Sequence, residues 1–242
     1  MIRLMRGEFY RLLRKKSAYA YFGALAAAYF LAAFVRSGGF GAESALRDAS
    51  NFFLFLPPVA GGFVFASVYV DDLNSKTLTA LVGAGVGKAQ IVLTKLAVAL
   101  CLNAAVFVLA PLFHLAAYAT LGAGADAQAA ASVFIESLRY FLMSAAYSAM
   151  SGVVVYGLQR ATFAVAAYLL LSFGVVGGLI AAAFRQFAPG LADYLVPGVV
   201  NKLISAIAEG TPALMPFAIY ALYLAAAAAV SVAAFEKKEM EF

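Results

Sequence analysis

The sequence predicts an all-α integral membrane protein with six transmembrane helices, an N-terminal interfacial helix and a cytoplasmic hairpin between the second and third spans. Of its 242 residues, 65% are hydrophobic and 12% are charged, with a mean hydropathy of +0.92. A soluble domain of this length needs more polar surface than that. The apolar residues form blocks of about 20, the length that crosses a bilayer as a helix. A single transmembrane domain over residues 1–242 is expected, with spans at 17–35, 52–70, 91–121, 133–156, 162–184 and 213–235.

Residues 1–16 precede the first span and are predicted to form an amphipathic helix in the membrane interface. Apolar residues recur at helical spacing, and charged residues on the opposite face meet anionic headgroups. A basic tail that only sets topology is the alternative. No clear cleavage site ends the first apolar block, so we expect this block to be a retained anchor. The charged residues assigned to the interfacial helix are Arg3, Arg6, Glu8, Arg11 and Arg14.

The basic residues predict the orientation of the spans. Six spans place both chain ends on one side of the membrane, and most of the 17 Lys and Arg residues fall on that side. The acidic residues are divided evenly, so the asymmetry lies in Lys and Arg, as the positive-inside rule requires. We therefore expect a multi-pass protein of the cell membrane with both termini in the cytoplasm and a tail at residues 236–242. The net charge of +5 follows from this topology and does not indicate nucleic-acid binding.

Residues 71–90, between the second and third spans, are polar enough to leave the bilayer and short enough to form a hairpin. Asp72 and Lys76 are four residues apart with the acid first, which suits one helix and its dipole. A partly apolar face and a glycine-rich turn follow. Such a helix fits an apolar groove on a soluble partner; an ordinary interfacial hairpin is the alternative. The residues assigned to docking are Asp72, Lys76, Thr77, Leu78, Leu81, Val82 and Lys88.

Two other segments depart from a simple pattern of spans and loops. The third predicted span is longer than a bilayer needs, so we expect it to tilt or project, and Pro111 is a candidate kink. In the external loop at 185–212, apolar residues predict one or two short amphipathic helices. These helices could enter the outer leaflet or cap an exit path. A loop that lies on the surface without a specific role is the alternative. Small residues four apart, such as Gly174 and Gly178, allow helices to approach closely.

Few residues have the pattern of a chemical site. The run from Gly83 to Lys88 lacks the first glycine and the Ser/Thr of a P-loop, so we exclude a nucleotide site. Cys101 is the one cysteine, which excludes a disulfide framework and a thiolate metal site. No predicted span has a mid-membrane acid or base for ion coupling, and hydrolase motifs are absent. The polar residues of the spans include Asn103, His114, Glu136 and Arg139; we expect the lone His114 to pack rather than bind a ligand.

The order and spacing of these features resemble an ABC-2-type ABC transporter permease. That family commonly starts with R-G-E-(aromatic or aliphatic)-x-(K/R), which here reads RGEFYR at residues 6–11. After the second span it has an acidic residue, then Gly-Thr-(Leu/Ile), leucines, a basic residue and a closing lysine. Here Lys76 stands where glycine is usual, Asp72 replaces Glu and Lys88 replaces Arg. The matching residues are Asp72, Thr77, Leu78, Leu81, Lys88, Ile91 and Lys95. The chain length is similar to small permeases that export or expel antimicrobial peptides, including lantibiotic-immunity permeases.

The resemblance implies a non-catalytic permease subunit of an ATP-driven exporter in a bacterial cell membrane. Two permease chains, identical or paralogous, would form the translocation path, and each would dock a separate subunit that binds ATP and Mg²⁺. This chain itself would bind no cofactor. The hairpin would act as the coupling helix and move as a rigid body. An amphipathic peptide or a lipid-like molecule is the expected cargo. A secondary transporter or channel, a non-transporting membrane scaffold and a membrane-bound enzyme are the alternatives.

Overall fold

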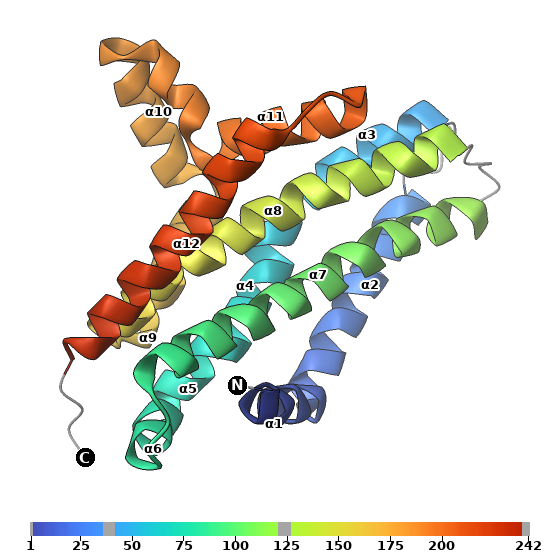
Figure 1. Ribbon diagram of the computed structural model, residues 1–242. Helices are drawn as coiled ribbons and strands as arrows, with labels where there is room; N and C mark the ends of the chain where they lie inside the picture. The colour runs from blue at the N-terminus through green and yellow to red at the C-terminus, as the bar shows by residue number, and fades with distance from the viewer. Residues whose placement is uncertain (1, 36–41, 121–126, 239–242) are drawn as a thin grey trace.

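The computed structural model describes residues 2–35, 42–120 and 127–238, and the regular structure in these residues is helical (Figure 1). The predicted tail at 236–242 thus lies partly outside the described residues. The helices are α1 (Ile2–Leu13), α2 (Lys16–Val35), α3 (Ala42–Phe53), the π-helix η1 (Pro57–Gly61), α4 (Gly62–Phe65), the π-helix η2 (Ala66–Val70), α5 (Asp71–Asn74), α6 (Thr77–Gly83), α7 (Lys88–Thr120), α8 (Ala127–Leu158), α9 (Ala161–Ser172), α10 (Val175–Phe187), the 3-10 helix η3 (Pro189–Tyr194), α11 (Val196–Glu209) and α12 (Leu214–Glu236).

Four helical stretches in the described residues are long and apolar enough to cross a membrane, and the bent pair α9/α10 makes up to five. They match the second to sixth predicted spans, so the prediction of an all-α membrane protein is confirmed. The first predicted span coincides with α2, but the number six stays a prediction. The four stretches are Asp48–Asn74, Lys88–Thr120, Ala127–Leu158 and Leu214–Glu236.

The predicted fifth span, residues 162–184, is not one straight helix. It is broken into α9 and α10, which are bent by 55° relative to each other. Gly174 lies at the break with φ 73°, a left-handed conformation that glycine adopts without steric cost. Among its described neighbours, no atom lies within 4 Å of a Cβ added at Gly174 or Gly178. Gly174 therefore permits the bend, and neither glycine brings two of the described helices together. Figure 1 shows α10 turned away from the bundle.

The second span contains two π-helical segments, η1 and η2, on either side of α4. Pro57 and Pro58 have no N–H for the helical ladder, which disturbs the normal α-helical pattern there. Hydroxyl groups from other helices bond to carbonyl groups of η1: the Tyr168 hydroxyl donates to the Pro57 oxygen at 2.8 Å, and the Tyr21 hydroxyl donates to the Val59 oxygen at 2.6 Å. Neighbouring helices thus satisfy irregular backbone within the apolar layer.

Helix α8 lies at the centre of the bundle and packs against α7, α9 and α12. Its small residues permit this close approach, as predicted from their spacing. Gly152 faces Ser231 of α12, and a Cβ added at Gly157 would lie 3.8 Å from the Cβ of Ala234. Ser144, Ser148 and Gly152 are buried on the same helix.

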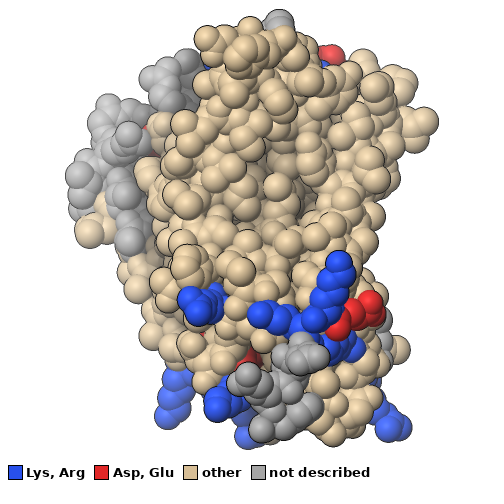
Figure 2. Space-filling view, turned by 90° about the vertical axis from the view of Figure 1, so that its left-hand side faces the viewer, with Lys and Arg blue, Asp and Glu red and all other residues tan. Residues whose placement is uncertain are grey.

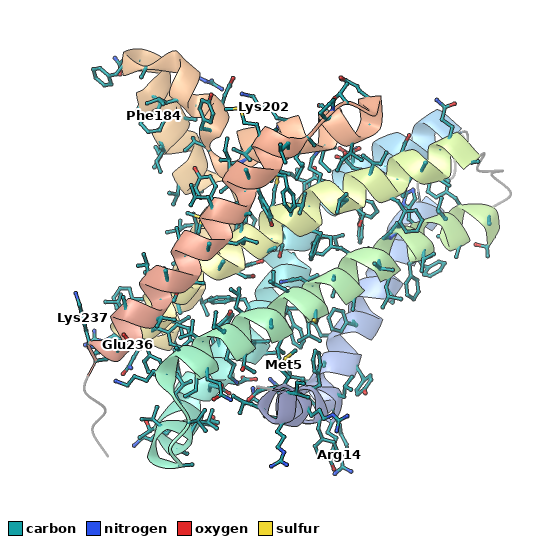
Figure 3. All side chains as sticks on the ribbon, viewed as in Figure 1. Met5, Arg14, Phe184, Lys202, Glu236 and Lys237 are labelled. Carbon is teal, nitrogen blue, oxygen red and sulfur yellow. The ribbon has the colours of Figure 1, made fainter. Side chains whose placement is uncertain are left out.

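The two ends of the bundle differ in the elements and charges that they hold. Figure 1 shows α1, the α5–α6 hairpin and the end of α12 at one end, and α3 and α11 at the other. Figure 3 places Arg14, Glu236 and Lys237 at the first end, with Phe184 and Lys202 at the second. In Figure 2, basic side chains gather in the lower part of the surface, below a broad uncharged region. The hairpin therefore lies at the basic end.

The segments predicted as external loops contain helices. Residues 42–51, predicted as loop, belong to α3. In the loop predicted at 185–212, the expected short amphipathic helix is present as α11, and its buried residues are Val196, Val199, Val200, Leu203 and Ile204. Pro111 lies inside α7, which continues through it to Thr120.

Candidate functional site

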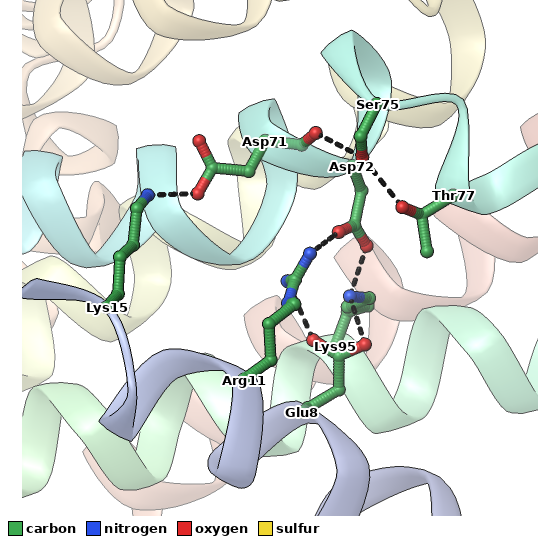
Figure 4. Close-up of polar contacts among 8 residues, drawn as sticks. All are labelled: Glu8, Arg11, Lys15, Asp71, Asp72, Ser75, Thr77 and Lys95. Carbon is green, nitrogen blue, oxygen red and sulfur yellow. Dashed lines mark hydrogen bonds and ion pairs between the residues drawn. The ribbon is translucent and has the colours of Figure 1, made fainter.

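A network of four charged side chains lies where the hairpin joins the bundle (Figure 4). Glu8 and Arg11 come from α1, Asp72 from the start of α5, and Lys95 from the third turn of α7. On α1, Glu8 and Leu12 are one helical turn apart and both are buried, so this face of α1 is the one that packs on the bundle. The network therefore joins the N-terminal helix, the hairpin and the third span.

Positive and negative groups alternate in the network. Lys95 Nζ lies 2.7 Å from Glu8 Oε1, and Arg11 Nη2 lies 2.8 Å from Glu8 Oε2. The two oxygens of Asp72 pair with the same two cations, one with Arg11 and the other with Lys95. Beside the network, Lys15 pairs with Asp71 across the gap between α1 and α5. Each of the four central groups thus has two partners of opposite charge.

Three of the four members, Glu8, Asp72 and Lys95, are buried and Arg11 is partly exposed; this burial raises the cost of losing a partner. Asp72 and Lys95 have no exposed surface, and Glu8 is 6% exposed. Removing one partner of a buried ion pair costs about 3–5 kcal/mol because it leaves an uncompensated charge. Burial alone lowers the pKa of the Arg11 guanidinium, but the attraction of the Asp72 and Glu8 carboxylates outweighs it, so the pKa is raised. Arg11 therefore stays charged.

The hairpin is two short helices and not one. We expected Asp72 and Lys76 to lie on one helix; this was wrong. Lys76 adopts φ 55°, a left-handed conformation that interrupts the helix between α5 and α6. The Ser75 hydroxyl lies 2.7 Å from the main-chain carbonyl oxygen of Asp71 and 2.6 Å from the Thr77 hydroxyl. These two contacts fix the corner between α5 and α6. Asp72 instead pairs with α1 and α7.

The apolar residues of the hairpin face the protein itself. Leu78 is 5% exposed and belongs to the main hydrophobic core, and Leu81 and Val82 pack against that core while remaining half-buried. Leu78 and Asp72 are therefore attachment residues in this structure, and neither is exposed to a partner. The part of the hairpin that is exposed is polar or small: Asn74, Ser75, Lys76, Ala80, Gly83, Ala84, Gly85 and Gly87.

Lys88 joins the hairpin to the last helix. Its ammonium donates to the main-chain carbonyl oxygen of Lys238 at 2.7 Å and to that of Glu236 at 3.4 Å. It also lies 5.4 Å from the centre of the Phe235 ring. A cation at a helix C-terminus stabilises the unpaired carbonyl groups and the negative end of the helix dipole. Lys88 was predicted to take part in docking; in the structure it is the first residue of α7 and contacts the end of α12.

The charged residues assigned to the interfacial helix divide into two groups. Arg3, Arg6 and Arg14 are exposed, as expected for the headgroup side of an interfacial helix, whereas Glu8 and Arg11 enter the network. The Arg14 guanidinium lies 4.4 Å from the centre of the Tyr10 ring. Lys95 was named only as the lysine that closes the motif. A lysine about two turns into an apolar helix was the signal that it needed a buried partner.

A second buried polar group lies deeper between the spans. Ser144 is within 3.3 Å of the Asn103 amide oxygen and 3.0 Å of the Tyr168 hydroxyl, and the Asn103 amide nitrogen is 3.5 Å from Ser148. Tyr168 in turn bonds to η1, so this group joins α7, α8, α9 and the second span. His114, also fully buried, stacks on Tyr118 with 4.7 Å between ring centres.

The other candidate residues form local contacts only. Arg139 pairs with Glu136 at 3.2 Å, one helical turn apart on α8. Within the described residues, no group of three or more His, Cys, Asp or Glu side chains is placed to hold a metal ion.

Comparison with known proteins gives one family match. The family model described as ABC-2 family transporter protein matches residues 4–178, which is well over half of the chain and includes most of α1, the hairpin and all four members of the charged network. No curated protein and no solved structure matches.

Proposed function

The chain belongs to the ABC-2 family of transporter proteins, and from this we propose that ATP-driven motion enters it through the α5–α6 hairpin. As a membrane component of an ABC transporter, it associates with a separate ATP-binding subunit. That subunit would hold ATP and Mg²⁺ and push on the exposed side of the hairpin. The observation that carries this proposal is the buried network of Glu8, Arg11, Asp72 and Lys95 at the base of the hairpin.

A coupling element must be stiff where it joins the bundle, because a soft joint absorbs the motion instead of passing it on. The hairpin meets this requirement at three places. Asp72 is held between α1 and α7, Leu78 is packed in the core, and Lys88 holds the end of α12. A displacement of the hairpin would therefore move the second and third spans together with α1 and α12.

The docking surface that we propose is the exposed face around Lys76, Ala80, Gly83 and Ala84, with Thr77, Leu81 and Val82 beside it. Small side chains allow a partner's backbone to approach closely, and Lys76 offers the positive charge that orients the contact. This replaces an apolar docking face centred on Leu78, since Leu78 is occupied within the chain.

We further propose six spans, with α2 as the first, both termini in the cytoplasm of a bacterial cell and the hairpin on the same side. The basic residues at the hairpin end of the bundle support this orientation through the positive-inside rule. Two permease chains, identical or paralogous, would enclose the path. Export of an amphipathic peptide or lipid-like molecule is the proposed activity, by resemblance to small permeases of this kind.

The docking proposal is tested by co-purification of the full chain with its ATP-binding subunit in mild detergent. Ala80→Arg adds a long charged side chain to the exposed face without touching the core. An interface that cannot pair this charge should weaken at least a hundredfold in Kd, about 3 kcal/mol. Asn201→Arg, on the exposed side of α11 at the other end of the bundle, is the matched control and should bind normally.

Two outcomes contradict the proposal. If Ala80→Arg binds as tightly as the unchanged chain, the partner docks elsewhere. If the unchanged pair does not associate, a non-transporting scaffold or a secondary transporter becomes the better interpretation. Leu78→Asp is not a suitable test alone, because it places a carboxylate in the core and is expected to unfold the hairpin.

A further inference from the structure

An apolar groove with a volume of about 250 Å³ runs between α2 and α7. It is lined by Lys15, just before α2, by one face of α2 from Ala18 through Phe22 to Ala26, and on α7 by residues that include Leu109 and Phe113. Residues of the second span form its floor. Among the described residues that line it, Lys15 is the only charged one.

The groove is about as long as one leaflet is deep. The stretch from Lys15 to Ala26 measures about 16 Å at the helical rise of 1.5 Å per residue. Half the hydrocarbon thickness of a bilayer is about 15 Å. At the far end, α2 and α7 meet again where the rings of Phe30 and Phe113 lie 6.2 Å apart. The groove therefore begins at a charged corner and ends near the middle of the apolar layer.

Basic side chains surround the open end. Lys15 lines the groove there and pairs with Asp71, while Arg14 and Lys16 on either side of it are exposed. Within the part of the chain that is described, neither Arg14 nor Lys16 has an acidic partner. Tyr19, also at this end, is 62% exposed and donates its hydroxyl to the Leu13 oxygen at 2.6 Å, a position typical of aromatic residues at a membrane interface.

We propose that this groove binds one acyl chain of an anionic phospholipid from the cytoplasmic leaflet, with the phosphate held by Arg14 and Lys16. The length of the groove fits one chain in one leaflet, and the excess positive charge at its mouth fits a negative headgroup. A helix of a second copy is about 10–12 Å across and does not fit a space of this volume. The inference rests on the proposed orientation of α1, not on docking of the ATP-binding subunit.

The bound lipid would join two elements that touch little elsewhere. Phe30 of α2 meets Phe113 of α7 at the far end, and Tyr21 of α2 stacks on Phe63 of α4 with 4.2 Å between ring centres, but nearer Lys15 the groove separates α2 from α7. An acyl chain filling it adds apolar contacts on both sides. Lipid composition would thus set how firmly α2 follows the motion of α7.

The test uses a tryptophan reporter, because the chain contains no tryptophan. The full-length Leu109→Trp protein, with its reporter in the groove, is placed in phosphatidylcholine nanodiscs containing either brominated phosphatidylglycerol or brominated phosphatidylcholine at equal mole fraction. We expect the anionic lipid to reach half-maximal quenching at about a 25-fold lower mole fraction, since each of the two basic residues near the headgroups favours anionic lipid about fivefold. Leu222→Trp, exposed on α12, is the control reporter and should show no comparable preference.

Two further variants make the assignment specific. Arg14→Gln with Lys16→Gln should abolish the preference at Leu109→Trp while leaving quenching by both lipids intact. Ala26→Phe, which fills the groove, should reduce quenching by both. If both lipids quench Leu109→Trp equally when the protein carries no other change, the proposed anionic site is overturned. If neither lipid quenches this reporter, another occupant fills the groove. Neither readout depends on ATP or on the partner subunit.

Discussion

The ammonium of Lys95 on α7 lies 2.7 Å from the carboxylate of Glu8 on α1, and both side chains are buried. This contact fastens the N-terminal helix under the third span, and Asp72 adds the hairpin to the same set of charges. A helix that could have floated in the membrane interface is therefore a fixed part of the bundle. The consequence is that charge changes at this joint should affect stability more than charge changes at the surface.

Lys95→Met should lower the free energy of unfolding by about 3–5 kcal/mol, because Glu8 and Asp72 would keep only Arg11 as a counter-ion in a buried site. Thermal unfolding in mild detergent, followed by circular dichroism, measures the change. Lys202→Met is the control, since the Lys202–Asp193 pair is exposed and contributes at most about 1 kcal/mol. Equal falls in Tm for the two variants would show that the network does not stabilise the fold.

Gly61→Ala should destabilise the protein by about 1–3 kcal/mol, because the new methyl group would overlap the Tyr168 hydroxyl and the Ser144 hydroxyl. Gly62→Ala is a closely matched control: its methyl group would lie 3.6 Å from Tyr168, an ordinary contact. Since alanine favours helix over glycine, the control should be neutral or slightly stabilising. The same thermal measurement separates the two, and a stable Gly61→Ala protein would contradict the tight packing of η1 on α9.

Gly174→Ala should also destabilise, by about 1–2 kcal/mol, but through the backbone and not through packing. The residue has φ 73°, and an alanine there meets the steric penalty of the left-handed region. Gly178→Ala, inside α10 with no atom within 4 Å of the added methyl group, should be neutral or stabilising. If Gly174→Ala matches Gly178→Ala in Tm, the 55° bend between α9 and α10 does not depend on this conformation.

Lys88→Gln should speed hydrogen exchange in the last turn of α12, because the turn loses the cation that contacts its terminal carbonyl groups. The loss in global stability should stay below about 1 kcal/mol. Hydrogen exchange with mass spectrometry measures the local effect, and Lys88→Arg, which keeps the charge, should stay close to the unchanged protein. Unaltered exchange at the end of α12 in Lys88→Gln would mean that the hairpin is not joined to α12 through this side chain.

Most of the element positions were predictable because they depend on local sequence. The length of an apolar run is set by the thickness of the bilayer, so the second, third, fourth and sixth predicted spans fall within a few residues of the observed helices. The amphipathic pattern of α11 was also predictable, because it too depends on local sequence. The break at Gly174 was not, because the sequence is apolar on both sides and offers no change of pattern.

The candidate site was predicted in its residues but not in its contacts. Asp72 and Lys88 were named from their spacing in the sequence, yet their partners lie on other elements. Asp72 pairs with Arg11 and Lys95, and Lys88 contacts the end of α12. Leu78 was correctly seen as part of an apolar face, but the periodicity of one short helix does not tell whether that face meets the protein or a partner.

By itself, the sequence determined that the chain is helical, lies in a membrane, has most of its basic residues at one end and has a polar hairpin after the second span. These follow from composition and from periodicities that act over one or two helical turns. Only the tertiary structure decided that Glu8, Arg11, Asp72 and Lys95 form one buried network and that the apolar face of the hairpin turns inward. Ion pairing acts over a few ångströms, so it depends on how α1, α5 and α7 are placed in space, and that placement is fixed by the packing of the whole bundle.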